Sequence, residues 1–361
     1  MIERYLEELD SFIDVSKVRE AENLQIRSCR YEDVERLPIA LCTFDDMSKE
    51  RYPTFTKWPV FSYGEIFRDK EKMLLDELLP IYEGVLAGDD RTKVIRANYG
   101  VGILPSVFGL EIIQKDDEMP WVKPVSSIEE VKKIVKRGVP EIKSGLIEKV
   151  NETNEYYKEK ISHYPNLKDT IHIGLPDPLG IFNLAGVIMG EELYISIYEH
   201  RDVIKDLLEL CTQTYIKYAE VQKKLVGEPM ETGYYFACTL PSGVKISEDY
   251  GLAISPDKYE EFCIPYNEIV AKRFNGITLV ICEDIESKML KKILDTKGLK
   301  GLIYWSKDFK KLEEAYELAK ESKICIIWYG NIPANRKSDF PTGIILKQRI
   351  RSLRDAEIIK Q

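Results

Sequence analysis

The sequence predicts an α/β protein whose simplest architecture is a (β/α)₈ TIM barrel with an N-terminal helical or irregular extension. Short apolar segments alternate with amphipathic helical segments from about residue 92 onward, a pattern that favours parallel strands joined by helical crossovers. Polar and reactive residues directly follow several of the apolar segments. A doubly wound open sheet is the alternative architecture.

The predicted strands share a short length and a high content of isoleucine, valine, leucine and aromatic residues. We expect a glycine, a proline, an asparagine or an acid to close each of them. They cover residues 93–98, 170–174, 231–238, 277–282, 301–304 and 324–328, with 38–44 as a weaker candidate. Six clear strands and one or two weaker ones suit the eight positions of a barrel.

The predicted helices have apolar residues at i, i+3 and i+4 spacing. Ser255 is a plausible N-cap for the predicted helix 256–274, with Pro256 at its first position. They cover residues 139–161, 202–225, 256–274 and 308–321, with 344–353 closing the chain. We expect residues 1–90 to be an N-terminal extension that caps a barrel of residues 91–361, the whole forming one structural domain.

Composition excludes some classes of protein. The net charge of -9, with dispersed basic residues, gives no support for a nucleic-acid surface. No apolar run is long enough to span a membrane, and the charged N-terminus does not resemble a secretion signal. The seven cysteines are scattered and odd in number, which favours reduced thiols and a cytoplasmic location.

The candidate site residues follow the predicted strands, because the C-terminal ends of barrel strands converge on one mouth. We expect Cys282, Glu283 and Asp284 to be catalytic. The expected substrate-binding residues are Asn98, Tyr99, Asp177, Glu248, Trp305, Tyr329 and Asn331.

Structural roles compete with these assignments. Cys282 could be a small buried hydrophobe, with Glu283 and Asp284 capping the next helix. Asp177 could likewise cap the helix that follows it, and Tyr99 and Tyr329 could belong to the rim rather than to a pocket wall. The three histidines form no recognisable catalytic pairing in the sequence.

Four segments in order resemble the uroporphyrinogen decarboxylase superfamily, and more closely its methyltransferase-like branch. They are the glycine-rich segment 97–109, the segment 177–190, the segment 248–266 with its Ser255-Pro256 and Pro265-Tyr266 pairs, and the turn 330–332. The resemblance covers roughly residues 90 to 350 and implies a TIM barrel. It also implies methyl transfer involving a corrinoid carrier protein, and homodimers as the expected assembly.

The chain departs from this family at two places. Residues 38–47 lack the arginine cluster with which the haem-pathway decarboxylases bind porphyrinogen carboxylates, which argues against that substrate. The resemblance also implies a zinc ion held by a histidine and two cysteines. Val280 stands at the histidine position, Cys282 matches the first cysteine, and no cysteine follows Asn331. Cys238 and Glu283, with Glu248, are the residues that could rebuild a zinc site around Cys282.

Three functional hypotheses follow. The leading one is an enzyme that transfers a methyl group between a small methylated substrate and a corrinoid protein. The second is a cofactorless decarboxylase of a small carboxylate or porphyrinogen-like substrate, which needs a cation in the mouth such as Arg96 or Lys245. The third is a non-catalytic barrel that has lost the family zinc site.

Overall fold

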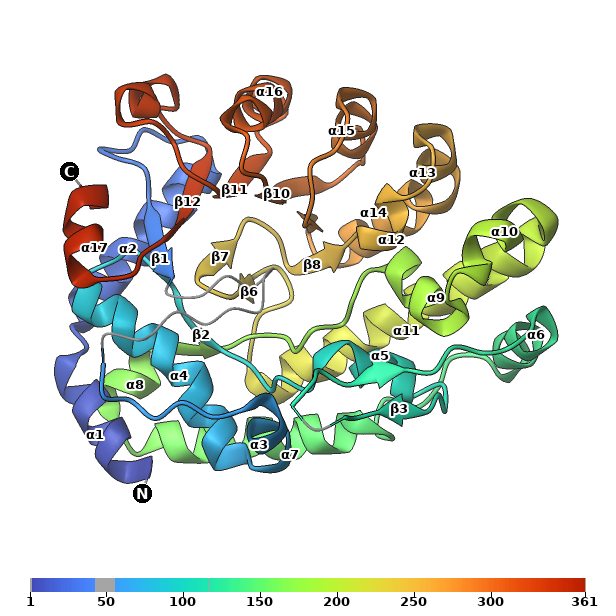
Figure 1. Cartoon of the computed structure of the whole chain (residues 1–361), viewed down its shortest axis with the longest axis horizontal. Helices are drawn as coiled ribbons and strands as arrows, with labels where there is room; N and C mark the ends of the chain where they lie inside the picture. The colour runs from blue at the N-terminus through green and yellow to red at the C-terminus, as the bar shows by residue number, and fades with distance from the viewer. Residues whose placement is uncertain (1, 43–55, 116, 361) are drawn as a thin grey trace.

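The fold is organised around a six-stranded parallel sheet with the order β1-β12-β11-β10-β9-β8 (Figure 1). The computed structural model describes residues 2–42, 56–115 and 117–360. The strands are β1 (Ile39–Cys42), β8 (Val244–Ser247), β9 (Ile277–Ile281), β10 (Leu299–Trp305), β11 (Cys325–Tyr329) and β12 (Ile344–Arg349). A separate parallel pair is formed by β2 (Lys93–Ile95) and β5 (Ile171–Ile173). The chain is therefore an α/β protein with parallel sheets.

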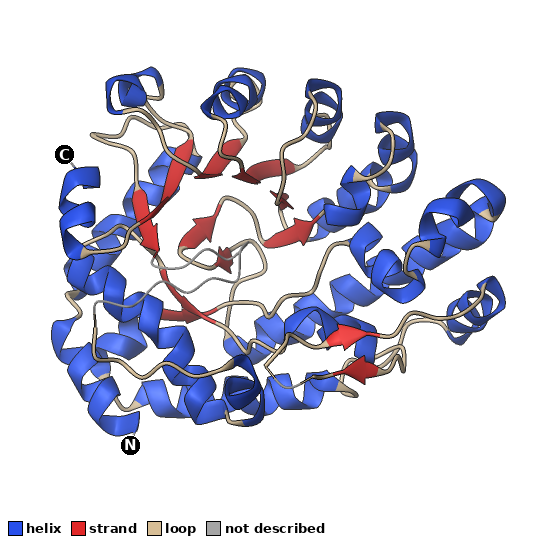
Figure 2. Ribbon diagram, in the orientation of Figure 1, coloured by secondary structure: helices blue, strands red, loops and turns tan. Residues whose placement is uncertain are grey.

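Helices surround the strands on the outside of the molecule (Figure 2). This arrangement is the one that parallel strands require, since each crossover places a helix against the sheet. The helices are α1 (Ile2–Phe12), α2 (Val15–Cys29), α3 (Tyr63–Arg68), α4 (Lys70–Ala87), α5 (Ile103–Ser106), α6 (Ile128–Arg137), α7 (Leu146–Ser162), α8 (Pro165–Thr170), α9 (Ile181–Met189), α10 (Glu192–Glu199), α11 (Arg201–Val226), α12 (Asp249–Leu252), α13 (Pro256–Phe262), α14 (Ile264–Arg273), α15 (Ser287–Leu294), α16 (Phe309–Ala319) and α17 (Leu353–Lys360).

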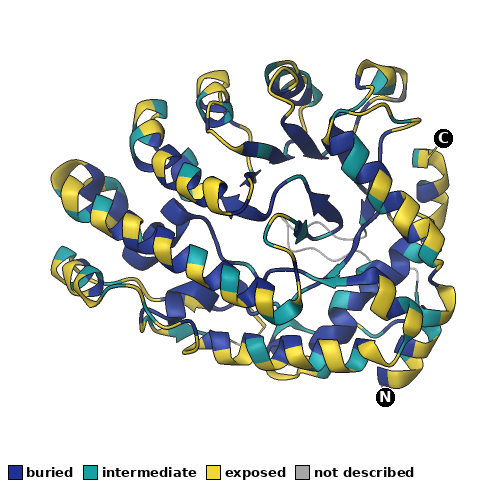
Figure 3. Cartoon of the chain, turned by 180° about the vertical axis from the view of Figure 1, so that it is seen from behind, coloured by how far each residue is buried: buried dark blue, intermediate teal, exposed yellow. Residues whose placement is uncertain are grey.

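Burial follows this layering. All five residues of β9 are buried, and the exposed residues lie mainly on the outward faces of the helices (Figure 3). No single helix in the described part of the chain is long and apolar enough to cross a membrane. Only together do the consecutive helices α9 and α10 have the length and apolar composition of a membrane span, and the two are bent relative to each other by 106°.

Two antiparallel pairs stand apart from the parallel strands. One joins β3 (Ile112–Ile113) to β4 (Trp121–Val122), and the other is the hairpin of β6 (Gly233–Tyr235) and β7 (Cys238–Leu240). The hairpin lies in the centre of the view, enclosed by the parallel strands (Figure 1). Its two-residue turn is Phe236-Ala237, and Phe236 has a φ of 47°.

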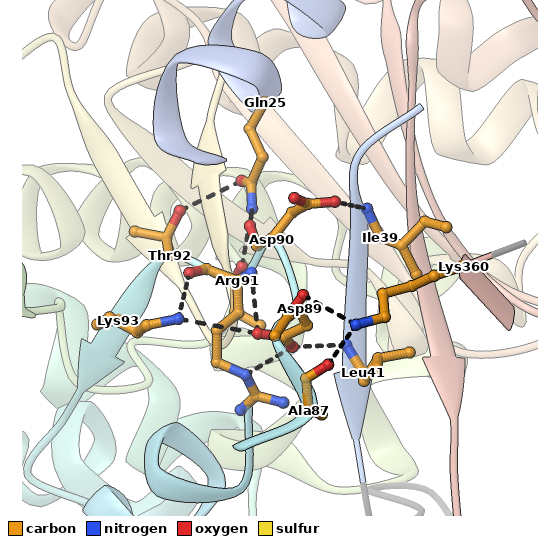
Figure 4. Close-up of polar contacts among 12 residues, drawn as sticks. Gln25, Ile39, Leu41, Ala87, Asp89, Asp90, Arg91, Thr92, Lys93 and Lys360 are labelled. Carbon is orange, nitrogen blue, oxygen red and sulfur yellow. Dashed lines mark hydrogen bonds and ion pairs between the residues drawn. The ribbon is translucent and has the colours of Figure 1, made fainter. Parts of the chain in front are cut away.

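Polar contacts join β1 to the start of β2, where the described residues form no strand ladder. We call residues 89–93, together with Ile39 and Leu41, the β1–β2 seam. Asp90 accepts a hydrogen bond from the Ile39 amide at 2.9 Å, and Asp89 accepts one from the Leu41 amide at 2.8 Å (Figure 4). The Asp90 amide donates to the Ile39 carbonyl at 2.9 Å. The two carboxylates thus accept the hydrogen bonds of β1 amides that would otherwise be donated to the carbonyls of a neighbouring strand.

The structure corrects three sequence predictions. Residues 344–349 form strand β12, not a helix, because they pair with both β11 and β1. A strand buried on both faces lacks the period-two pattern that would distinguish it from a helix. The expected strand 231–238 turns back on itself at Phe236, and the expected helix 256–274 breaks at Cys263 into α13 and α14. Strand β8 was not among the predicted strands.

The segment 1–90 contributes more than a cap. Its strand β1 pairs in register with β12, with Ile39 opposite Leu346 and Cys42 opposite Arg349. Residues 43 and 44 of the expected strand 38–44 lie outside the described residues. The N-terminal segment therefore belongs to the main sheet as well as flanking it.

Candidate functional site

A cavity of about 690 Å³ opens at the C-terminal ends of the parallel strands. Its walls come from residues at or just beyond the ends of β1, β2, β5, β9 and β10, from α3 and α4, and from the tip of the β6–β7 hairpin. Such a volume is typical of small-molecule sites. Ligands of parallel α/β proteins bind at this end of the strands.

Asp177 is the charged centre of the cavity wall. It follows β5 and accepts hydrogen bonds from the Lys245 ammonium and, at 3.3 Å, from Arg96 Nη1. Burial alone would raise the pKa of Asp177, but Lys245 and Arg96 outweigh it and hold that pKa below its ordinary value. Asp177 is therefore an ionised carboxylate with a fixed orientation at neutral pH.

Cys282 lies on the same wall, one residue beyond β9. Burial, together with the neighbouring Asp249 carboxylate, raises the pKa of the Cys282 thiol to about 12. Asn183 Nδ2 donates to that carboxylate at 2.8 Å. Cys282 is thus a protonated thiol at neutral pH, whereas a nucleophile must be a thiolate.

Aromatic and cationic side chains gather around the hairpin tip. Arg96 and Lys347 each lie 4.6 Å from the ring centre of Phe236. A positive φ is uncommon for a residue of this size and costs backbone energy. The side-chain contacts of Phe236 with the two cations are consistent with a turn held in this conformation to shape the cavity.

Four of the predicted site residues line the cavity, namely Asn98, Asp177, Cys282 and Trp305. Tyr329 does not line the cavity itself but packs against one of these residues, Trp305. Its ring stacks on Trp305 with the ring centres 3.9 Å apart, and its hydroxyl accepts a hydrogen bond from Lys347 at 2.7 Å.

The other predicted residues lie elsewhere. Glu283, Asp284 and Asn331 are exposed and do not line the cavity. Tyr99 is buried with its hydroxyl 2.8 Å from that of Thr153. Glu248 is fully buried and accepts a hydrogen bond from Asn267 at 2.8 Å.

Burial raises the pKa of Glu248 to about 8, which makes it mainly a neutral acid inside the fold. Cys238 is also buried, in an apolar cluster that includes Cys29 and Cys325, and burial raises its pKa to about 12. The residues described here include no group of three or more histidine, cysteine, aspartate or glutamate side chains placed to hold a metal ion. The set Cys282, Cys238 and Glu283 is therefore not brought together.

Sequence reasoning missed Lys347, Arg91 and the hairpin aromatics Tyr235 and Phe236 as cavity residues. A signal for Lys347 did exist. It directly follows the apolar run Ile344–Leu346, and a buried strand tolerates such a charge only where it meets a partner or a cavity. The prediction of a helix over 344–353 hid that signal.

Comparison with known proteins adds one finding. No protein-family model matches the chain, and no curated protein does. Among solved structures, a methyltransferase from Methanosarcina mazei has the same overall fold with a TM-score of 0.61 and 16% sequence identity. The match covers 94% of this chain and 97% of that one. The chain thus shares, over nearly its whole length, the fold of this archaeal methyltransferase.

Proposed function

We propose that the chain is a (β/α)₈ barrel enzyme of the uroporphyrinogen decarboxylase superfamily, in its methyltransferase-like branch. The eight parallel strands and the full-length fold likeness to a methyltransferase support this assignment. In this proposal the ring closes at two places where the described residues form no ladder, across the β1–β2 seam and between β5 and β8. The reaction moves a methyl group from a small methylated substrate in the cavity to a corrinoid carried by a partner protein.

The ionised Asp177, held by Lys245 and Arg96 on the cavity wall, is the observation that carries the proposal. Methyl transfer breaks the bond between the methyl carbon and a heteroatom of the substrate. The electron pair stays on that heteroatom, and the acceptor supplies the pair for the new bond to carbon. Arg96, oriented by Asp177, provides a cationic hydrogen-bond donor for the heteroatom, and solvent then supplies its proton.

Zinc has no place in this reaction scheme. The described residues bring together no group of three or more histidine, cysteine, aspartate or glutamate side chains that could hold the ion, and Cys238 and Glu283 do not join Cys282. The proposed chemistry therefore depends on positioning and on preorganised charge.

The test is to mix the purified protein with cob(I)alamin and a panel of methylated alcohols, thiols, amines and aryl ethers. Formation of methylcobalamin is followed by its visible spectrum. We expect turnover with at least one donor, and a loss of roughly 10²-fold in kcat for Asp177→Asn. The matched control is Asp295→Asn, at an exposed position that ends α15. Turnover with no donor, or full activity of Asp177→Asn, contradicts the proposal.

A second candidate is a cofactorless decarboxylase of a small carboxylate, favoured by the presence of Arg96 and Lys347 on the cavity wall. Decarboxylation breaks a bond from carbon to the carboxylate and leaves the electron pair on that carbon, which then takes a proton. Carbon dioxide released from a panel of organic acids without any corrinoid would support this candidate over methyl transfer.

A further inference from the structure

Arg91 is a buried arginine that belongs to both the β1–β2 seam and the cavity wall. The residue is 4% exposed, and its Nε donates to Asp89 Oδ2 at 2.9 Å. The Arg91 amide donates to the other oxygen of the same carboxylate at 3.3 Å. Gly84 of α4 makes room for the side chain, since a Cβ at that position would lie 2.2 Å from Arg91 Nε. The guanidinium is therefore held in one place.

The two terminal nitrogens of Arg91 are not used by the seam. Within residues 2–42, 56–115 and 117–360, neither nitrogen has a hydrogen-bond or ion-pair partner. In Figure 4 they point away from Asp89, and Arg91 is one of the residues that line the cavity. An arginine whose Nε is occupied presents its remaining N–H groups as a planar fork suited to a carboxylate.

Lys347 of β12 supplies a second buried cation to the same cavity, with 5% of the residue exposed. Its ammonium donates to the Tyr329 hydroxyl at 2.7 Å and lies over the Phe236 ring. Arg91, Lys347 and Phe236 all line this one cavity. Its wall thus carries two buried cations, a guanidinium and an ammonium.

We propose that Arg91 and Lys347 form an anion subsite that binds a carboxylate of a small organic acid. The proposal deepens the proposed function, because it takes the cavity to be the substrate site and assigns the substrate class. Asp76 and Glu77 also line the cavity, so the subsite is a local pair of cations and not a generally positive surface.

The need to neutralise Asp89 does not by itself explain why an arginine is buried at position 91. Lys93 already lies 3.8 Å from Asp89, with its side chain 4% exposed, and the Leu41 amide donates to the same carboxylate. A guanidinium adds a forked donor directed at the cavity. The bound carboxylate is the non-reacting end of the substrate, and its binding energy positions the reacting end near Asp177.

Titration calorimetry of the full chain with succinate tests the subsite without corrinoid or methyl donor. Succinamide serves as the neutral analogue and inorganic phosphate as the competing anion. We expect succinate to bind, succinamide not to bind, and phosphate to bind more weakly than succinate. Arg91→Gln and Lys347→Met should each weaken succinate binding by roughly 10-fold or more. The control is Lys93→Met, a buried seam residue that does not line the cavity, and it should bind as the unmodified chain does.

Three results would overturn the subsite. They are equal binding of succinate and succinamide, unchanged succinate affinity in Lys347→Met, and a loss in Lys93→Met as large as in Arg91→Gln. Tighter binding of phosphate than of succinate would reject the carboxylate class. Because Lys347 lies outside the seam, its variant decides the question even if Arg91→Gln fails to fold. Failure of methyl transfer leaves this binding result unaffected, so the two proposals fail separately.

Discussion

The sheet is held together in two different ways on its two sides. Around β9, backbone ladders to β8 and β10 join strands whose residues are almost all buried. At the β1–β2 seam, the carboxylates of Asp89 and Asp90 accept hydrogen bonds from the amides of β1. The buried cations Arg91 and Lys93 neutralise Asp89, and the exposed Arg36 pairs with Asp90. A ladder uses only the backbone, whereas the seam depends on side-chain charge. The seam is therefore the more fragile join, and its Arg91 lines the cavity.

Asp89→Ala should have the largest effect on stability. The change leaves Arg91 and Lys93 without their shared carboxylate and the Leu41 amide without an acceptor. Removing one partner of a buried ion pair costs roughly 3–5 kcal/mol. Urea unfolding measures the change, with Asp33→Ala, at an exposed position, as control. A loss below about 1 kcal/mol would show that the seam is no more fragile than the surface.

Leu279→Ala tests the ladder side of the comparison. Leu279 is fully buried in β9, opposite Ile246 on one side and Leu302 on the other. We expect a loss of roughly 3 kcal/mol from lost burial and the remaining cavity. The ladder loss should be the same at pH 8 and pH 9.5, because no charge is involved. A loss that changes with pH would remove the distinction between the two sides.

The seam should respond to pH through Lys93. Burial lowers the pKa of Lys93 to about 8, although Asp89 acts in the opposite direction. Between that value and the ordinary lysine pKa, the unfolded chain binds more protons than the folded chain, so stability rises with pH. The contribution amounts to roughly 2 kcal/mol between pH 8 and 9.5.

The difference in unfolding free energy between the unmodified chain and Lys93→Met isolates this contribution from other titrating groups. We expect the unfolding free energy of the unmodified chain to increase relative to that of Lys93→Met as the pH rises through this range. Parallel stability curves would mean that Lys93 keeps its ordinary pKa.

Much of the fold could be predicted from the sequence because it depends on local pattern. The strands around 93, 171, 277, 301 and 325 are short apolar runs with clear ends, and each lies where it was expected. Strand β12 and the hairpin turn at Phe236 could not be predicted, because pairing with distant segments decides both. A phenylalanine with positive φ is not a residue type that marks a turn.

The candidate site was predictable to the extent that it follows strand ends. Asn98, Asp177, Cys282 and Trp305 met that rule and line the cavity. Glu283 and Asp284 follow β9 just as closely but lie exposed in the loop before α15, since the rule does not say which way a loop turns. The strand-end rule could not find Arg91, because this residue precedes β2 and only its long side chain reaches the cavity.

The hairpin that carries Phe236 is fastened to the rest of the molecule by its backbone. The Ala237 carbonyl accepts hydrogen bonds from the Thr92 amide at 2.9 Å and from Gln25 Nε2 at 3.2 Å. The side chains of Tyr235 and Phe236 are not needed for these bonds. A homologue could therefore exchange both aromatics, and with them the shape of the cavity, while keeping the attachment of the hairpin. Selection for a new substrate could act at this turn without disturbing the architecture that supports it.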